Sequence, residues 1–199
     1  MRFQIACFAA LAVAACVARA APNIGEPAPE FSLPGSDGRT HSLAEYKGKY
    51  VVLEWTNNEC PFVRKHYGSG NMQAQQKEVT GKGAIWLSIV SSAPGTQGYV
   101  DAAKAVALTK ERGAAPTAVL LDPTGEVGHK YDARTTPHMF LIAPDGKLIY
   151  MGGIDSIAST DPDDIPRATQ YVKAAFSQAS AGTPVTNPST RPYGCSVKY

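Results

Sequence analysis

Short runs of apolar residues alternate along the chain with segments in which apolar and polar residues recur at helical spacing. The runs at residues 50–55 and 84–90 are rich in β-branched and aromatic side chains, which is typical of strands in the middle of a sheet. The pattern predicts strands at residues 31–33, 40–43, 50–55, 84–90, 118–121, 139–143 and 147–151, and helices at residues 62–78, 97–112 and 165–178.

Glycine and proline mark the turns between these elements. The sequence Gly35-Ser36-Asp37-Gly38 separates the first two strands and Pro144-Asp145-Gly146 separates the last two, so each pair is predicted to form an antiparallel hairpin. Pro61 suits the first turn of the helix that follows it, and Gly68 and Gly70 can break that helix. Alternating strands and helices followed by a hairpin predict an α/β domain with a central mixed sheet and helices on both faces.

The domain is expected to occupy residues 21–180. Residues 181–199 contain three prolines and many small polar side chains, so they are predicted to form an extended C-terminal tail rather than a further element. We find no internal repeat and no low-complexity segment.

The first twenty residues have the features of a signal peptide. Arg2 precedes an almost wholly apolar stretch at residues 5–17, and Ala18-Arg19-Ala20 offers a small-x-small cleavage site. The stretch is too short for a membrane span. An alternative is a lipoprotein box, Val13-Ala14-Ala15-Cys16, with a lipid anchor at Cys16. Both interpretations predict export, to the periplasm or out of the cell.

Charge excludes some classes of partner. The full chain has 19 basic and 17 acidic residues, and cleavage after Ala20 removes two of the basic ones, so the mature protein is close to neutral. A neutral balance without a basic run argues against nucleic acid and against an anionic membrane surface as partners.

The same cleavage leaves Cys60 and Cys195 as the two cysteines of the mature protein. Cys60 lies between a predicted buried strand and a helix that begins at Pro61, where unpaired N–H groups and the helix dipole favour a thiolate. We therefore interpret Cys60 as a reactive nucleophile; the alternative is a buried structural cysteine. Two cysteines in an exported protein can form a disulfide, remain free, or cycle between these states.

Several motifs occur in an order that resembles one family. Thr136-Pro137 directly before a predicted strand is weak evidence alone, but its position after the third strand of the alternating part of the chain, residues 118–121, makes it more informative. The chain is similar over residues 24–178 to the thioredoxin-like redoxin superfamily, in particular to a peroxiredoxin-like branch of the alkyl hydroperoxide reductase/thiol-specific antioxidant group. The matching segments are Ile24-Gly25-Glu26-Pro27-Ala28-Pro29-Glu30-Phe31, the strand and helix around Cys60, Thr136-Pro137, Asp145-Gly146 and the ending at residues 191–199.

The resemblance implies a thioredoxin-like fold and a set of site residues. Thr136 and Pro137 would lie beside Cys60, and the backbone of Thr136 would pair with a substrate strand. Trp55 and Pro61 would also line the substrate site.

The chain departs from the family motifs near the nucleophile. Val63 stands where thioredoxins have their second cysteine, and Asn57 stands where peroxiredoxins have a threonine. Pro137 fills the place where peroxiredoxins have an arginine before the strand. Arg134 is the residue that could substitute for that arginine. The copper-binding relatives use C-P-x-x-C, whose last position is Arg64 here, so we expect no metal and no cofactor. Asn57, Arg64 and Arg134 are assigned supporting roles.

The sequence leaves three functions open. Cys60 could attack a disulfide or an oxidised thiol, with Cys195 as the resolving cysteine. It could instead reduce peroxides through a sulfenic acid. In the third, the protein is not an enzyme, and Cys60–Cys195 is a permanent disulfide. The expected partners are a protein or small molecule that carries a thiol or disulfide, and a thioredoxin-like electron donor.

Overall fold

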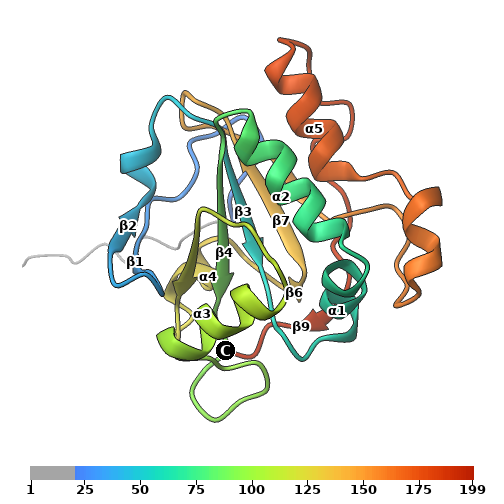
Figure 1. Ribbon diagram of the computed structural model, residues 1–199. Coiled ribbons are helices and arrows are strands. Elements are labelled where there is room, and N and C mark those ends of the chain that lie inside the picture. Colours follow the sequence, from blue (N-terminus) through green and yellow to red (C-terminus); the bar gives the residue numbers. More distant parts are fainter. Residues whose placement is uncertain (1–20) are drawn as a thin grey trace, which may run out of the picture.

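The computed structural model describes residues 21–199, so the predicted signal peptide and the lipidation site at Cys16 lie outside the described residues. A five-stranded sheet forms the centre of the domain, in the order β5-β4-β3-β7-β8 (Figure 1). β3 runs parallel to β4 and antiparallel to β7, which confirms the predicted mixed sheet. The strands are β3 (Val51–Trp55), β4 (Ile85–Val90), β5 (Ala118–Leu121), β7 (His138–Ile142) and β8 (Leu148–Gly152).

Both faces of this sheet are covered. Helices α1 (Pro61–Gly68), α2 (Asn71–Gly81) and α5 (Tyr171–Ser180) contribute to the apolar core on one face. The other face carries α4 (Glu126–Lys130) and the hairpin of β1 (Ser32–Pro34) and β2 (Thr40–Ser42). All residues of β3, β4 and β7 are buried, as expected for strands covered on both sides.

Two helices differ from their predicted bounds because of glycine and capping residues. The helix predicted at residues 62–78 is two helices, because Gly70 takes a left-handed conformation with φ 78° between α1 and α2. The helix predicted from residue 97 is α3 (Ala102–Glu111), which begins after Asp101. The Asp101 carboxylate accepts a hydrogen bond from the N–H of Lys104, so it caps the helix.

The last predicted helix begins later than residue 165. Residues 162–167 form a short 3₁₀ helix, η2 (Pro162–Arg167), which has a proline at position 166 and no buried residue. Gln170 then makes an antiparallel bridge to Asp155, and α5 starts at Tyr171. The apolar side chains at residues 165–170 are therefore not part of an amphipathic helix.

The tail contains a strand that the sequence did not predict. β9 (Cys195–Ser196) pairs antiparallel with β6 (Thr135–Thr136), and Figure 1 shows β9 close to α1. The remaining tail is extended, as predicted, and Met151 binds it through backbone hydrogen bonds with Pro188 and Thr190. Within residues 21–199, no helix is long and apolar enough to cross a membrane.

Candidate functional site

Cys60 lies at the junction of the central strand and the first helix. It is the N-cap residue of α1, and Pro61 occupies the first helical position, which needs no N–H donor. The side chain of Cys60 is fully buried. Its sulfur lies 3.1 Å from the carbonyl oxygen of Thr136, to which the thiol donates a hydrogen bond. The predicted nucleophile and the predicted Thr136-Pro137 motif are therefore in contact, and the Thr136–Pro137 bond is cis.

The tail brings the second cysteine to the same place. The register of β6 with β9 pairs Thr136 with Cys195, and the carbonyl of Thr136 also accepts the hydrogen bond of the Cys60 thiol, so both cysteines lie at the same residue. Both cysteines are free thiols in this structure, and Cys195 is only half-buried. Gly194 has φ 140° and packs so tightly that a Cβ atom there would lie 2.0 Å from the Thr136 carbonyl oxygen. Glycine is thus needed immediately before Cys195.

The two thiols differ in acidity. Burial acts to raise the pKa of Cys60, but this is outweighed by hydrogen bonds from the Cys195 thiol, from the N–H groups of Val63 and Cys195, and from Thr136. The pKa of Cys60 is therefore lowered. Burial and the neighbouring Cys60 raise the pKa of Cys195 to about 11. Cys60 is the group that ionises first, and Cys195 stabilises its thiolate as a donor.

A buried polar cluster holds the tail next to this pair. Tyr193 donates a short hydrogen bond from its hydroxyl to the carboxylate of Asp155. The ring of His66 contacts the same hydroxyl, with 3.3 Å between its Nε2 and the Tyr193 oxygen. Lys65 places its ammonium 3.6 Å from the second Asp155 oxygen. Lys65 and His66 belong to α1, so the cluster links the helix that Cys60 caps to the tail that carries Cys195.

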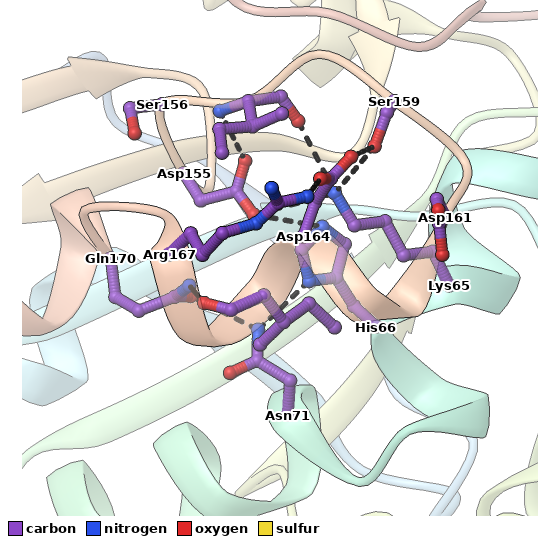
Figure 2. Close-up of polar contacts among 12 residues, drawn as sticks. Lys65, His66, Asn71, Asp155, Ser156, Ser159, Asp161, Asp164, Arg167 and Gln170 are labelled. Carbon is purple, nitrogen blue, oxygen red and sulfur yellow. Dashed lines mark hydrogen bonds and ion pairs between the residues drawn. The ribbon is translucent and has the colours of Figure 1, made fainter.

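The loop before α5 completes the cluster, as Figure 2 shows. Lys65 also donates to the carbonyl of Ile157 at 3.2 Å and to Ser159 at 3.3 Å. Asn71 donates to Nδ1 of His66 at 2.8 Å, which leaves the Nε2 proton of a neutral His66 for Tyr193. Burial lowers the pKa of His66 to about 4, with Asp155 opposing this and Lys65 adding to it. His66 is therefore neutral at pH 7.

The other predicted site residues build the surroundings of Cys60. Trp55 is fully buried and donates from its indole to Ser91 at 3.0 Å, so it belongs to the core beneath the site rather than to its surface. The amide of Asn57 shapes the loop before Cys60, since it accepts from the N–H of Glu59 and donates to the carbonyl of Gln97. Pro61 is exposed at the start of α1.

The side chains of the two arginines with predicted supporting roles bind residues other than Cys60. Arg64 is exposed and donates to the carbonyl of Asn58 at 3.2 Å. Arg134 is also exposed, and its guanidinium pairs with Asp132. The backbone of Arg134 does contribute to the site, because its carbonyl accepts from the N–H of Val197 and extends the pairing of the tail.

A buried carboxyl lies in the middle of the sheet and was missed by the sequence analysis. Glu54 accepts hydrogen bonds from Tyr67, Trp86, Ser88 and Gln76, and burial raises its pKa. An acidic residue inside an apolar strand pattern is the signal that could have identified it.

Histidines do not combine with the cysteines into a metal site in the described part of the chain. No group of three or more histidine, cysteine, aspartate or glutamate side chains suited to a metal ion occurs within residues 21–199. His138 is buried against the ring of Phe140, and burial lowers its pKa to about 4.

The fold is similar to that of several bacterial proteins of known structure. An uncharacterized conserved protein from Geobacillus kaustophilus shares 27% identity, with 89% of this chain and 92% of that chain covered and a TM-score of 0.78. A hypothetical protein from Sinorhizobium meliloti shares 22% identity over 90% of this chain and 96% of its own, with a TM-score of 0.72.

A third similar structure is the pneumococcal exposed lipoprotein thioredoxin from Streptococcus pneumoniae. It shares 28% identity, with 70% of this chain and 96% of that chain covered and a TM-score of 0.50. Among curated proteins, none matches this chain.

The family assignment rests on the sequence around the site and on the fold. The profile of the AhpC/TSA family matches residues 24–151, a range that contains Cys60, Thr136 and Pro137. The five-stranded mixed sheet with helices on both faces agrees with the resemblance drawn from the motifs. The chain belongs to the AhpC/TSA family of thioredoxin-like redoxins.

Proposed function

We propose that this protein is an exported thiol–disulfide oxidoreductase in which Cys60 is the nucleophile and Cys195 resolves it within the same chain. The observation that supports this most strongly is that Thr136 both pairs with Cys195 and accepts the hydrogen bond of the Cys60 thiol, which brings the two cysteines together. Val63, at the position of the usual second cysteine, is buried in the core, so the tail supplies the missing partner.

The reduced protein would transfer two electrons to a disulfide substrate. The Cys60 thiolate attacks one substrate sulfur, the substrate S–S bond breaks, and the other substrate sulfur leaves as a thiolate that takes up a proton. Cys195 then loses its proton and attacks the Cys60 sulfur of the mixed disulfide. This releases the second substrate thiol and leaves a Cys60–Cys195 disulfide. The substrate is reduced and the protein is oxidised.

Regeneration would proceed through the more accessible sulfur. Cys195 is half-buried whereas Cys60 is fully buried, so an external thiol meets the Cys195 sulfur of the disulfide first. Attack there expels Cys60 as a thiolate, and a thiol with a lowered pKa is the better leaving group. A second thiol of the donor then releases Cys195. A dithiol protein of the thioredoxin type fits this role.

Peroxide reduction is the second candidate, because the chain belongs to the AhpC/TSA family. The Cys60 thiolate would attack the peroxide, form a sulfenic acid and release water or an alcohol, and Cys195 would condense with the sulfenic acid. The site supports it less well, since Arg134 pairs with Asp132 at the surface and Asn57 is committed to its loop. A reaction with hydrogen peroxide no faster than that of free cysteine would exclude it.

Export is part of the proposal and rests on the sequence. The features of residues 1–20 favour a periplasmic or secreted protein, with lipidation at Cys16 as the alternative. The likeness to an exposed lipoprotein thioredoxin supports thiol chemistry outside the cytoplasm. Mass spectrometry of the protein from cell fractions distinguishes cleavage after Ala20 from a lipid on Cys16.

A redox titration tests the thiol pair directly. The mature protein is equilibrated in glutathione buffers, its thiols are trapped, and the linked peptides are mapped. A Cys60–Cys195 disulfide that forms reversibly above about −250 mV supports the proposal. A bond that resists reduction below about −300 mV identifies a structural clasp and contradicts it. The Cys195→Ser variant should accumulate mixed disulfides at Cys60, and the Cys60→Ser variant should accumulate far fewer.

A further inference from the structure

The tail occupies a backbone edge that a second polypeptide segment could occupy in the same way. β6 offers Thr135 and Thr136 to an antiparallel strand, and β9 fills this position with Cys195 and Ser196. Cys60 is fully buried with the tail in place, so no large disulfide reaches its sulfur in this conformation. Two segments cannot pair with the same edge at once.

The contacts of the tail show which segment this edge accepts. Gly194 lies so close to the edge that a Cβ atom would be 2.0 Å from the Thr136 carbonyl oxygen and 2.7 Å from its carbonyl carbon. Both atoms belong to backbone, so they cannot move aside as a flexible side chain would. The conformation of Gly194, with φ 140°, also disfavours any residue with a side chain.

The family resemblance already assigns the Thr136 edge to a substrate strand; we infer that the strand it accepts has glycine immediately before its reactive cysteine, and that the Tyr193–Ser196 segment of the tail is the occupant it displaces. This inference rests on the proposed function and deepens it, since it names the substrate class: a protein disulfide in a Gly-Cys strand. The substrate cysteine takes the place of Cys195 and so meets the Cys60 sulfur directly. Once the mixed disulfide has formed, the bound segment leaves the edge but stays attached through its sulfur, the tail returns, and Cys195 attacks Cys60.

Displacement must break a defined set of contacts. Next to the site, these are the β6–β9 pairing with its neighbouring bond from the Val197 N–H to the Arg134 carbonyl, and the hydrogen bonds of the Tyr193 hydroxyl with Asp155 and His66. Further along, the tail is held by Lys198, whose carbonyl accepts from the N–H of Ala93, and by Tyr199, which stacks on His129. The segment from Tyr193 to Ser196 can lift while these outer contacts remain. Tyr193→Phe removes the hydroxyl of the inner contact and keeps the ring that packs on Phe62.

A peptide exchange experiment tests the preference for glycine. The full mature chain with Cys195→Ser is mixed with a peptide of residues 191–197 whose cysteine is activated as a thionitrobenzoate disulfide. A second peptide carries alanine in place of its glycine. We expect the glycine peptide to form the mixed disulfide with Cys60 at least about tenfold faster than the alanine peptide, at concentrations where the rate is linear in peptide. The urea-unfolded protein, which has no edge, should react equally with both.

Tail displacement is tested by adding Tyr193→Phe to the same chain. This variant should accelerate the reaction of the glycine peptide, and the alanine peptide should stay slower. Equal rates for both peptides with the folded protein would overturn the inference, and if the Cys60–Cys195 pair still titrates reversibly, the proposed function survives alone. A folded Cys195→Ser protein that reacts with neither peptide nor with a small disulfide would contradict both.

Discussion

Acidification should weaken the fold through His138, because this histidine is buried without an acidic partner on its ring. Burial lowers its pKa to about 4 in the folded protein, with Arg134 acting in the same direction and Asp132 opposing both. In the unfolded chain the pKa is about 6.5. Above pH 6.5 the residue is neutral in both states and contributes no pH dependence. Below pH 6.5 the unfolded chain binds a proton that the folded chain does not, so the free energy of unfolding falls.

The magnitude follows from these two pKa values. The free energy of unfolding at pH 5 should be about 2 kcal/mol lower than at pH 7, and the loss should reach about 3 kcal/mol once the pH is well below 4. His138 is 5% exposed, so solvent does not reduce this effect appreciably. His138→Gln removes the titration but keeps a side-chain acceptor for the N–H of Arg134, which lies 3.2 Å from the imidazole.

Urea unfolding at pH 7 and pH 5 provides the measurement. The wild-type protein should lose about 2 kcal/mol more than His138→Gln between the two pH values. This double difference cancels any cost of the substitution that is independent of pH, and it also cancels the titration of all other groups. Equal losses for wild type and His138→Gln would refute the argument.

Three further predictions concern the thiol pair and the buried acid. Thiolate absorbance should show one cysteine ionising below the ordinary cysteine pKa, and Cys195→Ala should raise that pKa because it removes a donor to Cys60; an unchanged pKa would mean that Cys195 is not a donor. Gly194→Ala should detach β9 and accelerate alkylation of Cys60 by about tenfold or more, whereas Gly81→Ala at the end of α2, where a Cβ meets no atom within 4 Å, should not. Glu54→Gln should cost about 1–3 kcal/mol in urea unfolding, because its amide nitrogen would face a donor, while the exposed Glu45→Gln should cost little.

The sequence predicted the sheet well, because its three central strands are continuous apolar runs buried on both faces and its edge strands β5 and β8 still contain apolar residues bounded by turns. Residues 118–121 match β5, and the runs at 50–55 and 84–90 match β3 and β4 to within one residue. Gly70 breaks the first predicted helix, as its position indicated, whereas the start of α3 at Asp101 and of α5 after Gln170 was less predictable because it depends on local capping and packing.

The site was predictable in its parts but not in its assembly. The motifs indicated that Cys60 and Thr136-Pro137 would meet, and they do. The place of Cys195 on the Thr136 edge could not be derived, because a two-residue strand has no hydrophobic pattern. The buried polar cluster could not be derived either, because its charged and polar side chains meet through contacts between residues distant in sequence. Its members are Lys65, His66, Asp155 and Tyr193.

The Thr136–Cys195 register also has a mechanical consequence. A bond between Cys60 and Cys195 would turn everything between the first helix and the last strand into a covalent ring that contains β4, β5, β7 and β8. Force applied to the two ends of the oxidised chain would then bypass the ring and extend only the segments outside it. The reduced chain would instead unravel over its whole length. The redox state of Cys60 and Cys195 would therefore set the maximum extension of the chain under force.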